Sequence, residues 1–245
     1  MTLPYTISGI HNGQYTVTID LQAWMCSQQI LELQRNIRDI GQEDPHFQLI
    51  YSMYGSVLSY KSESLFPQDT NCDSKKKKVL IILGNAATHS VANGMFFFSM
   101  GKSGAEETHT FWNKLEKPGL IQKIRRSTLK EESETRKEMI INGSLSKDYL
   151  FGFTTFYSFP TPVKGDFKDV AGLRHLFKPV MKQIRDMEYD RLINYISQFQ
   201  FVRNALWVFH EKTSHCCAEK KFQQKFERWP ARGKGSGGED LKKIL

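Results

Sequence analysis

The sequence predicts an α/β fold in which helices cover both faces of a largely parallel sheet. Three apolar runs, at residues 79–83, 149–157 and 205–209, have the composition of strands buried on both faces. Segments with helical spacing of apolar residues lie between them. Strands that alternate with helices in this way form parallel sheets. A chain of 245 residues, 40% of them hydrophobic, can build the core of such a domain.

The chain is expected to begin with a hairpin. Residues 5–8 and 15–19 alternate between polar and apolar side chains. Between them lies Asn12-Gly13, a dipeptide that favours a tight turn.

A long helix is predicted after the hairpin. Asp20 can cap a helix over residues 21–40, and Gly41 can end it. Residues 46–60 are expected to form a second helix or an irregular segment. Residues 67–78 are polar, end in four lysines and are interpreted as a surface linker with a solvated charge run.

Further helices are predicted between and after the buried strands. Ser103-Gly104-Ala105-Glu106 fits a capping box, so a helix should start near Gly104 and stop before Pro118. The charged residues 125–137 are expected to form an exposed helix or a mobile loop. The remaining predicted helices cover residues 169–177, 179–199 and 215–228.

Three parts of the chain are expected to differ in organisation. Residues 1–66 should form a hairpin and helical extension packed on the core, and residues 67–232 the α/β core itself. Residues 233–245 begin with a glycine-rich spacer and are expected to form a flexible C-terminal tail.

Composition limits the classes of function. The 34 Lys and Arg residues exceed the 26 Asp and Glu residues, giving a net charge of +8, which suits a polyanionic partner such as nucleic acid. None of the 4 cysteines is spaced as Cys-x-x-Cys, so neither a metal site nor a disulfide framework is expected. With no apolar run of 18 residues and no signal-peptide pattern, we expect a cytoplasmic protein that does not enter membranes.

The segment that follows the first buried strand carries the strongest functional signal. Open α/β sheets bind ligands just beyond the carboxyl ends of their strands. At that position the chain has Gly84-Asn85-Ala86-Ala87-Thr88-His89-Ser90, followed by Gly94-Met95-Phe96-Phe97-Phe98 and Gly101-Lys102-Ser103-Gly104. Small residues, an amide, an imidazole and aromatic rings together suit a flat ligand with polar edges, such as a nucleobase.

This segment resembles the first motif of the uracil-DNA glycosylase superfamily, and most closely its type b and type 4 branches. That motif begins with Gly-x-Ala-Pro after a buried strand, continues to Gly-Arg-x-Phe, and ends with Gly-x-Ser-Gly at the start of a helix. The residues in step with it are Gly84, Ala86, His89, Gly94, Phe97, Gly101, Ser103 and Gly104. His210, directly after the third buried run, stands where the family's second motif begins with His-Pro-Ser.

The resemblance implies a fold and an activity. The fold is a three-layer α/β/α arrangement around a central, mostly parallel four-stranded sheet. The activity is that of a monomeric DNA repair enzyme for base excision, a hydrolase that needs no cofactor. Such an enzyme flips a damaged or deaminated base, uracil or a related base, out of single- or double-stranded DNA and hydrolyses its N-glycosidic bond.

The resemblance also implies roles for individual residues. Asn85 would orient the attacking water and His210 would face the leaving base, which makes these two the candidate catalytic residues. The candidate base-binding residues are Ala86, His89, Phe97 and Thr155, with Phe97 stacking on the base and Thr155 reading its edge. The candidate phosphate-binding residues, which follow His210, are Lys212, Thr213 and Ser214.

The chain departs from the family pattern at several positions. Ala87 stands in place of proline, Met95 in place of arginine, and Glu211 in place of the proline after the histidine. Thr155 stands where many members have an asparagine, and a hydroxyl contacts one edge atom of a base where an amide can pair with two. The cluster cysteines of the type b and type 4 branches are absent. A divergent enzyme, a reader of another base and an inactive relative therefore all remain open.

Two other classes of function compete with the glycosylase interpretation. One is a catalytically inactive module that binds nucleic acid with the same fold. The other is a small-molecule hydrolase or nucleotide-binding protein of doubly wound type. The sequence contains no complete phosphate-binding loop, no dinucleotide-binding glycine motif after a strand and no Gly-x-Ser-x-Gly elbow, which ranks the last class lowest.

Overall fold

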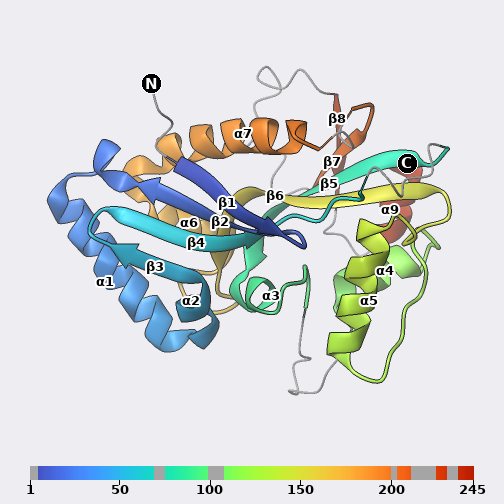
Figure 1. Ribbon diagram of the computed structural model, residues 1–245, viewed down its shortest axis with the longest axis horizontal. Coiled ribbons are helices and arrows are strands. Elements are labelled where there is room, and N and C mark those ends of the chain that lie inside the picture. Colours follow the sequence, from blue (N-terminus) through green and yellow to red (C-terminus); the bar gives the residue numbers. More distant parts are fainter. Residues whose placement is uncertain (1–4, 69–74, 99–107, 200–202, 211–224, 231–236) are drawn as a thin grey trace. The chain divides into compact units, whose positions relative to one another are not determined.

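The computed structural model describes residues 5–68, 75–98, 108–199, 203–210, 225–230 and 237–245 (Figure 1). The chain divides into two units, and each unit is assembled from segments that are far apart in the sequence. The first unit comprises Met1–Glu63, Asn85–Phe96 and Tyr157–Asp190. The second unit comprises Ser64–Gly84, Phe97–Phe156 and Arg191–Leu245.

An antiparallel sheet with the strand order β1-β2-β4-β3 forms the body of the first unit. Its strands are β1 (Tyr5–His11), β2 (Gln14–Asp20), β3 (Tyr51–Tyr54) and β4 (Val57–Glu63). The predicted hairpin of β1 and β2 is confirmed, with Tyr5 opposite Ile19 and a turn in which Asn12 and Gly13 both have positive φ. Every second side chain of β2 is buried, as expected for a sheet with one face on a core.

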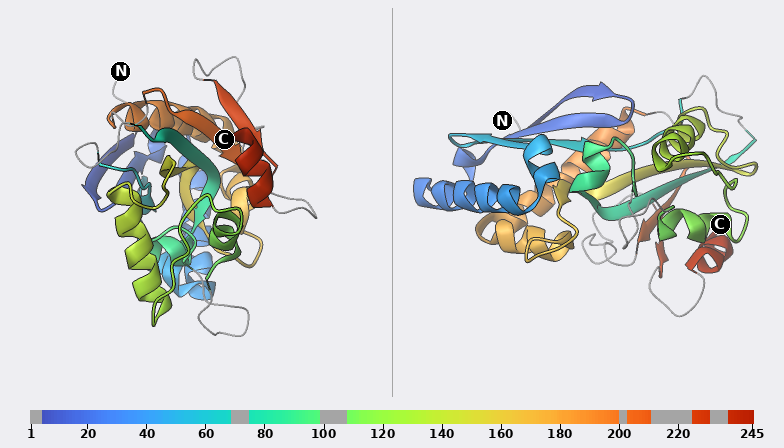
Figure 2. Two further views of the ribbon diagram at one scale, coloured as in Figure 1. Left: turned by 90° about the vertical axis from the view of Figure 1, so that its right-hand side faces the viewer. Right: turned by 90° about the horizontal axis from the view of Figure 1, so that it is seen from below.

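Helices complete the first unit, and Figure 2 shows α1 running alongside the antiparallel sheet. The helical elements are η1 (Leu21–Ala23), α1 (Ser27–Glu43), α2 (Pro45–Ile50), α3 (Thr88–Ala92), α6 (Asp169–Leu176), η3 (Lys178–Val180) and the first part of α7 (Met181–Ser197). The Gln34 side chain on α1 donates a hydrogen bond to the carbonyl of Gly55 in the turn between β3 and β4 at 2.8 Å.

The prediction for residues 46–60 is wrong beyond Ile50, because β3 and most of β4 lie there. Gly55, with a φ of 57°, makes the tight turn between these two strands, a conformation that glycine adopts without strain. Leu58 and Tyr60 of β4 are buried, whereas Val57 is exposed, so the apolar alternation in this segment has the period of a strand.

The predicted helix over residues 21–40 has different ends. Asp20 caps only the short η1, and α1 begins at Ser27, where Gln29 accepts a hydrogen bond from the backbone of Cys26 at 3.0 Å. Gly41 lies inside α1 and does not end it. A Cβ at Gly41 would lie 3.0 Å from Cγ of Gln48, so the glycine allows α2 to approach closely.

A parallel sheet flanked by helices forms the second architectural element and confirms the predicted α/β class. Its strand order is β6-β5-β7-β8. The strands are β5 (Lys77–Ala87), β6 (Tyr149–Thr161), β7 (Leu206–His210) and β8 (Phe226–Trp229). The first three contain the three apolar runs, except that Ala205 precedes β7. The last residues of β5 and β6 belong to the first unit and the rest of the sheet to the second.

Three predicted helices of the second unit differ in the structure. Residues 226–229 form strand β8 and not the end of a helix, because they pair in parallel with β7, with Trp229 beside His210. The helix predicted from Gly104 lies partly outside the described residues, and α4 (Thr110–Glu116) begins after a cap by the His109 side chain. The charged segment forms α5 (Leu129–Ile141), and it is not exposed throughout, since Glu132 and Arg136 are buried.

Hydrogen bonds from two lysine side chains connect separate segments of the second unit. The ammonium group of Lys76 donates to the carbonyls of Gly143 at 3.0 Å and Ser146 at 2.8 Å, so part of the lysine run is structural and not solvated. The segment expected to be a flexible tail contains a helix, α9 (Gly237–Ile244). The side chain of Lys242 in this helix donates a hydrogen bond to the carbonyl of Pro118 at 3.0 Å. Figure 1 shows α4, α5 and α9 gathered in this unit.

The buried hydroxyl of Tyr51 should make the free energy of unfolding depend on pH in the alkaline range. This hydroxyl donates to the carbonyl of Pro160 at 2.8 Å. Burial, and to a smaller extent the carboxylate of Glu188, raises the pKa of Tyr51 well above its ordinary value near 10. In the unfolded chain this phenol ionises near pH 10, whereas the folded protein keeps the proton. The stabilisation is therefore complete below about pH 10 and is lost as the pH rises from there toward the raised pKa.

We therefore expect Tyr51→Phe to flatten the loss of stability above pH 10. At pH 7 the variant should lose about 1 kcal/mol of unfolding free energy, the usual value of one buried hydrogen bond. Urea unfolding between pH 7 and pH 11 measures both effects. The control is Tyr54→Phe, which removes a hydroxyl from a ring that is 91% exposed. A Tyr51→Phe protein with the wild-type slope above pH 10 would contradict the assignment.

Candidate functional site

The amide of Asn85 is the best-defined polar group at the end of β5. Its Nδ2 donates to Oγ1 of Thr161 at 2.6 Å and to the carbonyl of Ala86 at 3.2 Å, and it lies 3.5 Å from the carbonyl of Phe159. Two of these three partners are carbonyl oxygens, which only accept hydrogen bonds, so the amide nitrogen must be the atom that faces them. The side-chain oxygen of Asn85 therefore points the other way, and no described residue donates to it.

The turn after Asn85 is held by a carboxylate from a distant segment. α3 begins directly after β5, and its N-cap residue Ala87 has no side chain that can cap it. Thr88, which is 1% exposed, donates from Oγ1 to Oδ2 of Asp44 at 2.5 Å. The other oxygen of Asp44 accepts the backbone N–H of His46 at 3.0 Å and so caps α2. One carboxylate thus joins the starts of α2 and α3.

Ala86 and His89, two of the predicted base-binding residues, lie in this same part of the first unit. Ala86 is buried, and its carbonyl is one of the acceptors that orient Asn85. His89 is half-buried in α3, with its ring centroid 6.4 Å from that of His46 at an angle of 58°. Asn85, Ala86 and His89 therefore lie together where β5 passes into α3, close to His46, which the sequence prediction did not include.

Three residues that shape this turn were missed by sequence reasoning: Asp44, His46 and Thr161. A signal for the first two existed, because Asp44 followed by Pro45 is a typical start of a helix. Their proximity to Thr88 and His89 had no signal in the sequence, since it arises from the packing of α2 against α3.

In the second unit, Phe97 is part of an aromatic cluster. Its ring stacks on that of Phe111, with centroids 4.0 Å apart and an angle of 18° between planes, and lies 4.9 Å from the ring of His109. The backbone of Phe97 has a φ of 52°, a left-handed conformation that a bulky residue adopts only at a cost of about 1–3 kcal/mol. Stacking on Phe111 fixes the plane of the ring that the sequence assigned to base binding.

The same cluster reaches His210. The ring of Phe111 lies 6.0 Å from that of Trp229, and Trp229 lies 5.9 Å from the ring of His210 in an edge-on arrangement. Trp229 is itself fixed, because its indole N–H donates to the carbonyl of Gly237. Phe97 and His210, predicted from two separate motifs, therefore belong to one series of ring contacts.

Thr155 differs from the other candidates because it is completely buried in β6. Its neighbour Thr154 shares a hydrogen bond with Ser64 at 2.7 Å, whereas the hydroxyl of Thr155 has no partner among the described residues. A buried hydroxyl of this kind is normally satisfied by water or by a ligand. The predicted phosphate-binding residues Lys212, Thr213 and Ser214 lie outside the described residues.

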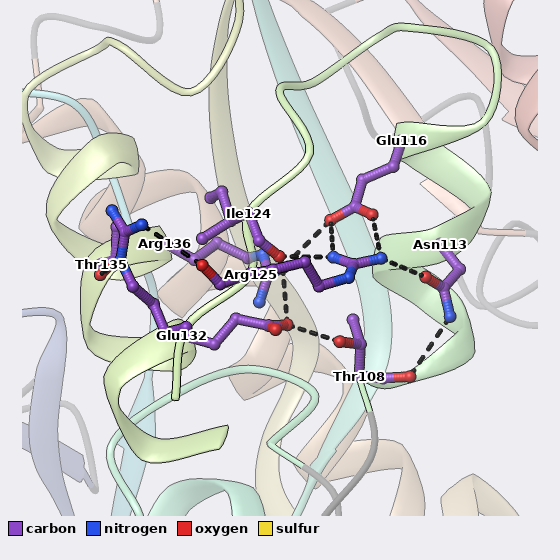
Figure 3. Close-up of polar contacts among 9 residues, drawn as sticks. Thr108, Asn113, Glu116, Ile124, Arg125, Glu132, Thr135 and Arg136 are labelled. Carbon is purple, nitrogen blue, oxygen red and sulfur yellow. Dashed lines mark hydrogen bonds and ion pairs between the residues drawn. The ribbon is translucent and has the colours of Figure 1, made fainter. Parts of the chain in front are cut away.

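A charge network centred on the buried Arg136 joins α4 to α5 (Figure 3). Arg136, which is 1% exposed, donates to Glu132 at 3.0 Å and to Glu116 at 3.2 Å. Arg125 binds the carboxylate of Glu116 through two nitrogens, at 2.8 Å and 3.1 Å. The hydrogen bond that Arg125 donates to Glu116 raises the pKa of Arg125. Both arginines and both carboxylates thus join α4 to α5 and the segment between them.

Trp112 connects this network to the rings. The guanidinium carbon of Arg136 lies 4.8 Å from the ring centroid of Trp112, within the range of a cation–π contact. Trp112 in turn meets Phe97 edge-on at 6.1 Å and Phe111 at 5.0 Å. Arg136 therefore lies behind the cluster that holds Phe97.

We expect Arg136→Met to destabilise the protein by about 3–5 kcal/mol, because it leaves two buried carboxylates with reduced compensation. Urea unfolding measures the loss, and about 1 M NaCl should not reduce it, since salt screens buried pairs weakly. The control is Lys243→Met, which breaks the ion pair with Asp240 on a side chain that is 78% exposed and should cost less than about 1 kcal/mol. Equal losses in the two variants would show that the network contributes no more than a surface pair.

Metal and membrane sites find no support in the described part of the chain. Among those residues, no group of three or more His, Cys, Asp or Glu side chains could hold a metal ion. None of the helices in the described ranges is long and apolar enough to cross a bilayer.

Comparison with protein-family models, with curated proteins and with solved structures finds no match for this chain. Function is therefore inferred from its residues and their geometry.

Proposed function

We propose that the chain is a DNA glycosylase-like enzyme that flips a damaged or deaminated base, uracil or a related base, out of DNA and hydrolyses its N-glycosidic bond. The proposal includes the three-layer α/β/α arrangement of uracil-DNA glycosylases for the parallel sheet and its helices. Under this proposal the protein acts in base excision repair, as a monomer on DNA, in the cytoplasm.

The observation that carries the proposal is the orientation of the Asn85 amide. Its nitrogen donates to two acceptors and lies near a third, so its oxygen is directed away from them at the carboxyl end of a parallel strand. Ligand sites of open α/β sheets lie at that edge. A fixed carbonyl oxygen can accept a hydrogen bond from a water molecule and hold it in one direction, which is the role that the resemblance gives to Asn85.

The reaction needs little covalent chemistry from the protein. The water oxygen attacks C1′ of the deoxyribose while the C1′–N bond breaks, and the electron pair of that bond leaves with the base. One proton of the water is released and the base takes up one proton, so atoms and charge balance. Asn85 aligns the water, and His210 is proposed to stabilise the negative charge that develops on the departing base.

Other features of the chain suit a nucleic-acid substrate. Phe97 is a ring in a fixed plane, which is the form of aromatic side chain that stacks on bases. The net charge of +8 favours approach to phosphate. The buried hydroxyl of Thr155 is proposed to contact an edge atom of the base, a role that its lack of a described partner leaves available.

We expect Asn85→Ala to lower the rate of base release by about 10²-fold or more, because the water loses its fixed acceptor. The assay measures free base released from single- and double-stranded oligonucleotides that carry uracil, hypoxanthine or xanthine. Asn142→Ala is the matched control, since Asn142 also orients its amide by local hydrogen bonds, in an exposed turn. Release of none of these bases by the folded wild-type protein would overturn the proposed activity and favour the inactive nucleic-acid-binding relative.

A measurement of DNA binding distinguishes an inactive nucleic-acid-binding relative from a protein with no nucleic-acid function. We expect Phe97→Ala to weaken binding of single-stranded DNA by about 1–3 kcal/mol, the usual loss for one stacked base. Phe97→Gly should weaken it equally, although glycine relieves the left-handed backbone strain and should leave the fold more stable than alanine does. Fluorescence anisotropy over a range of salt concentrations measures the affinity. An affinity that does not fall with salt would contradict phosphate binding.

A further inference from the structure

We propose that Asp44 is a positioning residue, which fixes the turn from Asn85 to His89 through the hydroxyl of Thr88 and thereby sets the direction of the Asn85 amide. This inference rests on the proposed function, because it assigns a role toward the same amide. Asp44 itself is not proposed to touch the substrate or the attacking water.

The two oxygens of Asp44 have separate tasks. Oδ1 accepts the backbone N–H of His46 at 3.0 Å, which is all that an N-cap requires. Oδ2 accepts the hydroxyl of Thr88 at 2.5 Å, and this contact joins residues 44 positions apart in the sequence. The second contact adds nothing to the capping of α2, so its effect must be on the segment that carries Thr88.

Thr88 has little freedom to use another acceptor. It is 1% exposed, so water does not replace Asp44 readily. It is the first residue of α3, and its hydroxyl is directed toward Asp44. If the carboxylate is removed, a buried hydroxyl loses its acceptor, and the start of α3 loses the contact that ties it to α2.

The path from Thr88 to Asn85 is short and stiff. Ala86 and Ala87 alone separate the two residues, and Ala87 is extended, with φ −89° and ψ 143°. Asn85 is held from the other side by Thr161. A shift of Thr88 is therefore passed along an extended chain to a side chain whose function requires a fixed direction. Misplacement by about 1 Å can cost about 10²-fold in rate.

The test compares four variants by two measurements. Asp44→Ala and Thr88→Val remove the contact from its two ends, and Thr88→Val leaves the cap of α2 intact. Asp44→Asn keeps an acceptor for His46 and a polar partner for Thr88, so it should retain most of the wild-type behaviour. Asp20→Ala is the matched control, since Asp20 accepts the backbone N–H of Gln22 and the hydroxyl of Ser56 in the same unit, and neither partner lies in α3.

The first measurement is hydrogen–deuterium exchange in peptides that cover residues 85–93. Asp44→Ala and Thr88→Val should speed exchange there by about tenfold or more, while Asp20→Ala should not. The second is the kinetics of base release from the uracil-containing oligonucleotide. Both variants should lower kcat by about 10²-fold and leave KM within about threefold, because they misplace a group that acts in the transition state.

The outcomes distinguish this inference from the proposed function. Exchange as slow as in Asp20→Ala would show that Asp44 does not fix the turn. Faster exchange with an unchanged kcat would show that the turn does not position Asn85, and the proposed function would stand. Failure of the wild-type protein to release base would overturn the proposed function and its link to Asp44, while the exchange result would still decide whether Asp44 holds the turn.

Discussion

In the first unit, β5 passes into α3 without an intervening loop, and this junction is the constraint on which the candidate site depends. The start of a helix exposes N–H groups that need partners, and the residue at the N-cap of α3 is an alanine. A proline at this position would stiffen the turn by itself. In this chain, hydrogen bonds from Thr88 to Asp44 and from Asn85 to Thr161 hold the turn from two sides. Side-chain contacts thus take over a task that a backbone constraint could perform.

The elements that the sequence predicted well are those whose signal is local and strong. The runs at β5, β6 and β7 are mostly apolar, since the central residues of each are buried on both faces, and a run of this kind is read directly from the residues. β3 and β8 have only four residues each and mix polar with aromatic side chains, so no periodicity distinguished them from a helix or a loop. Their identity is set by partners, β4 and β7, that lie elsewhere in the chain.

In the candidate site, too, the sequence indicated the residues with a local signal and missed those whose role depends on distant partners. Asn85 was selected as a candidate because it follows the apolar run at residues 79–83, and its neighbours Ala86 and His89 were selected with it. The acceptor Thr161 and the carboxylate Asp44 were not found, because hydrogen bonds across 76 and 44 positions leave no trace in one sequence. A polar residue beside a helix start has a sufficient local explanation as a cap, and nothing in the sequence shows that its second oxygen has another partner.

The largest error of the sequence-based prediction concerns the charged residues 125–137, which were expected to form an exposed helix or a mobile loop. A segment with alternating Lys, Glu and Arg is usually solvated, because burial of a single charge is expensive. In α5 the cost is offset because Arg136 finds two carboxylates and the face of Trp112 at once. An apolar core at the same place could be as stable, but it would not fix orientation, since apolar contacts are not directional. A network of donors and acceptors allows few arrangements of α4 against α5. Trp112, Phe111 and Phe97 are therefore held in one geometry, which is what a stacking surface for a flat ligand requires.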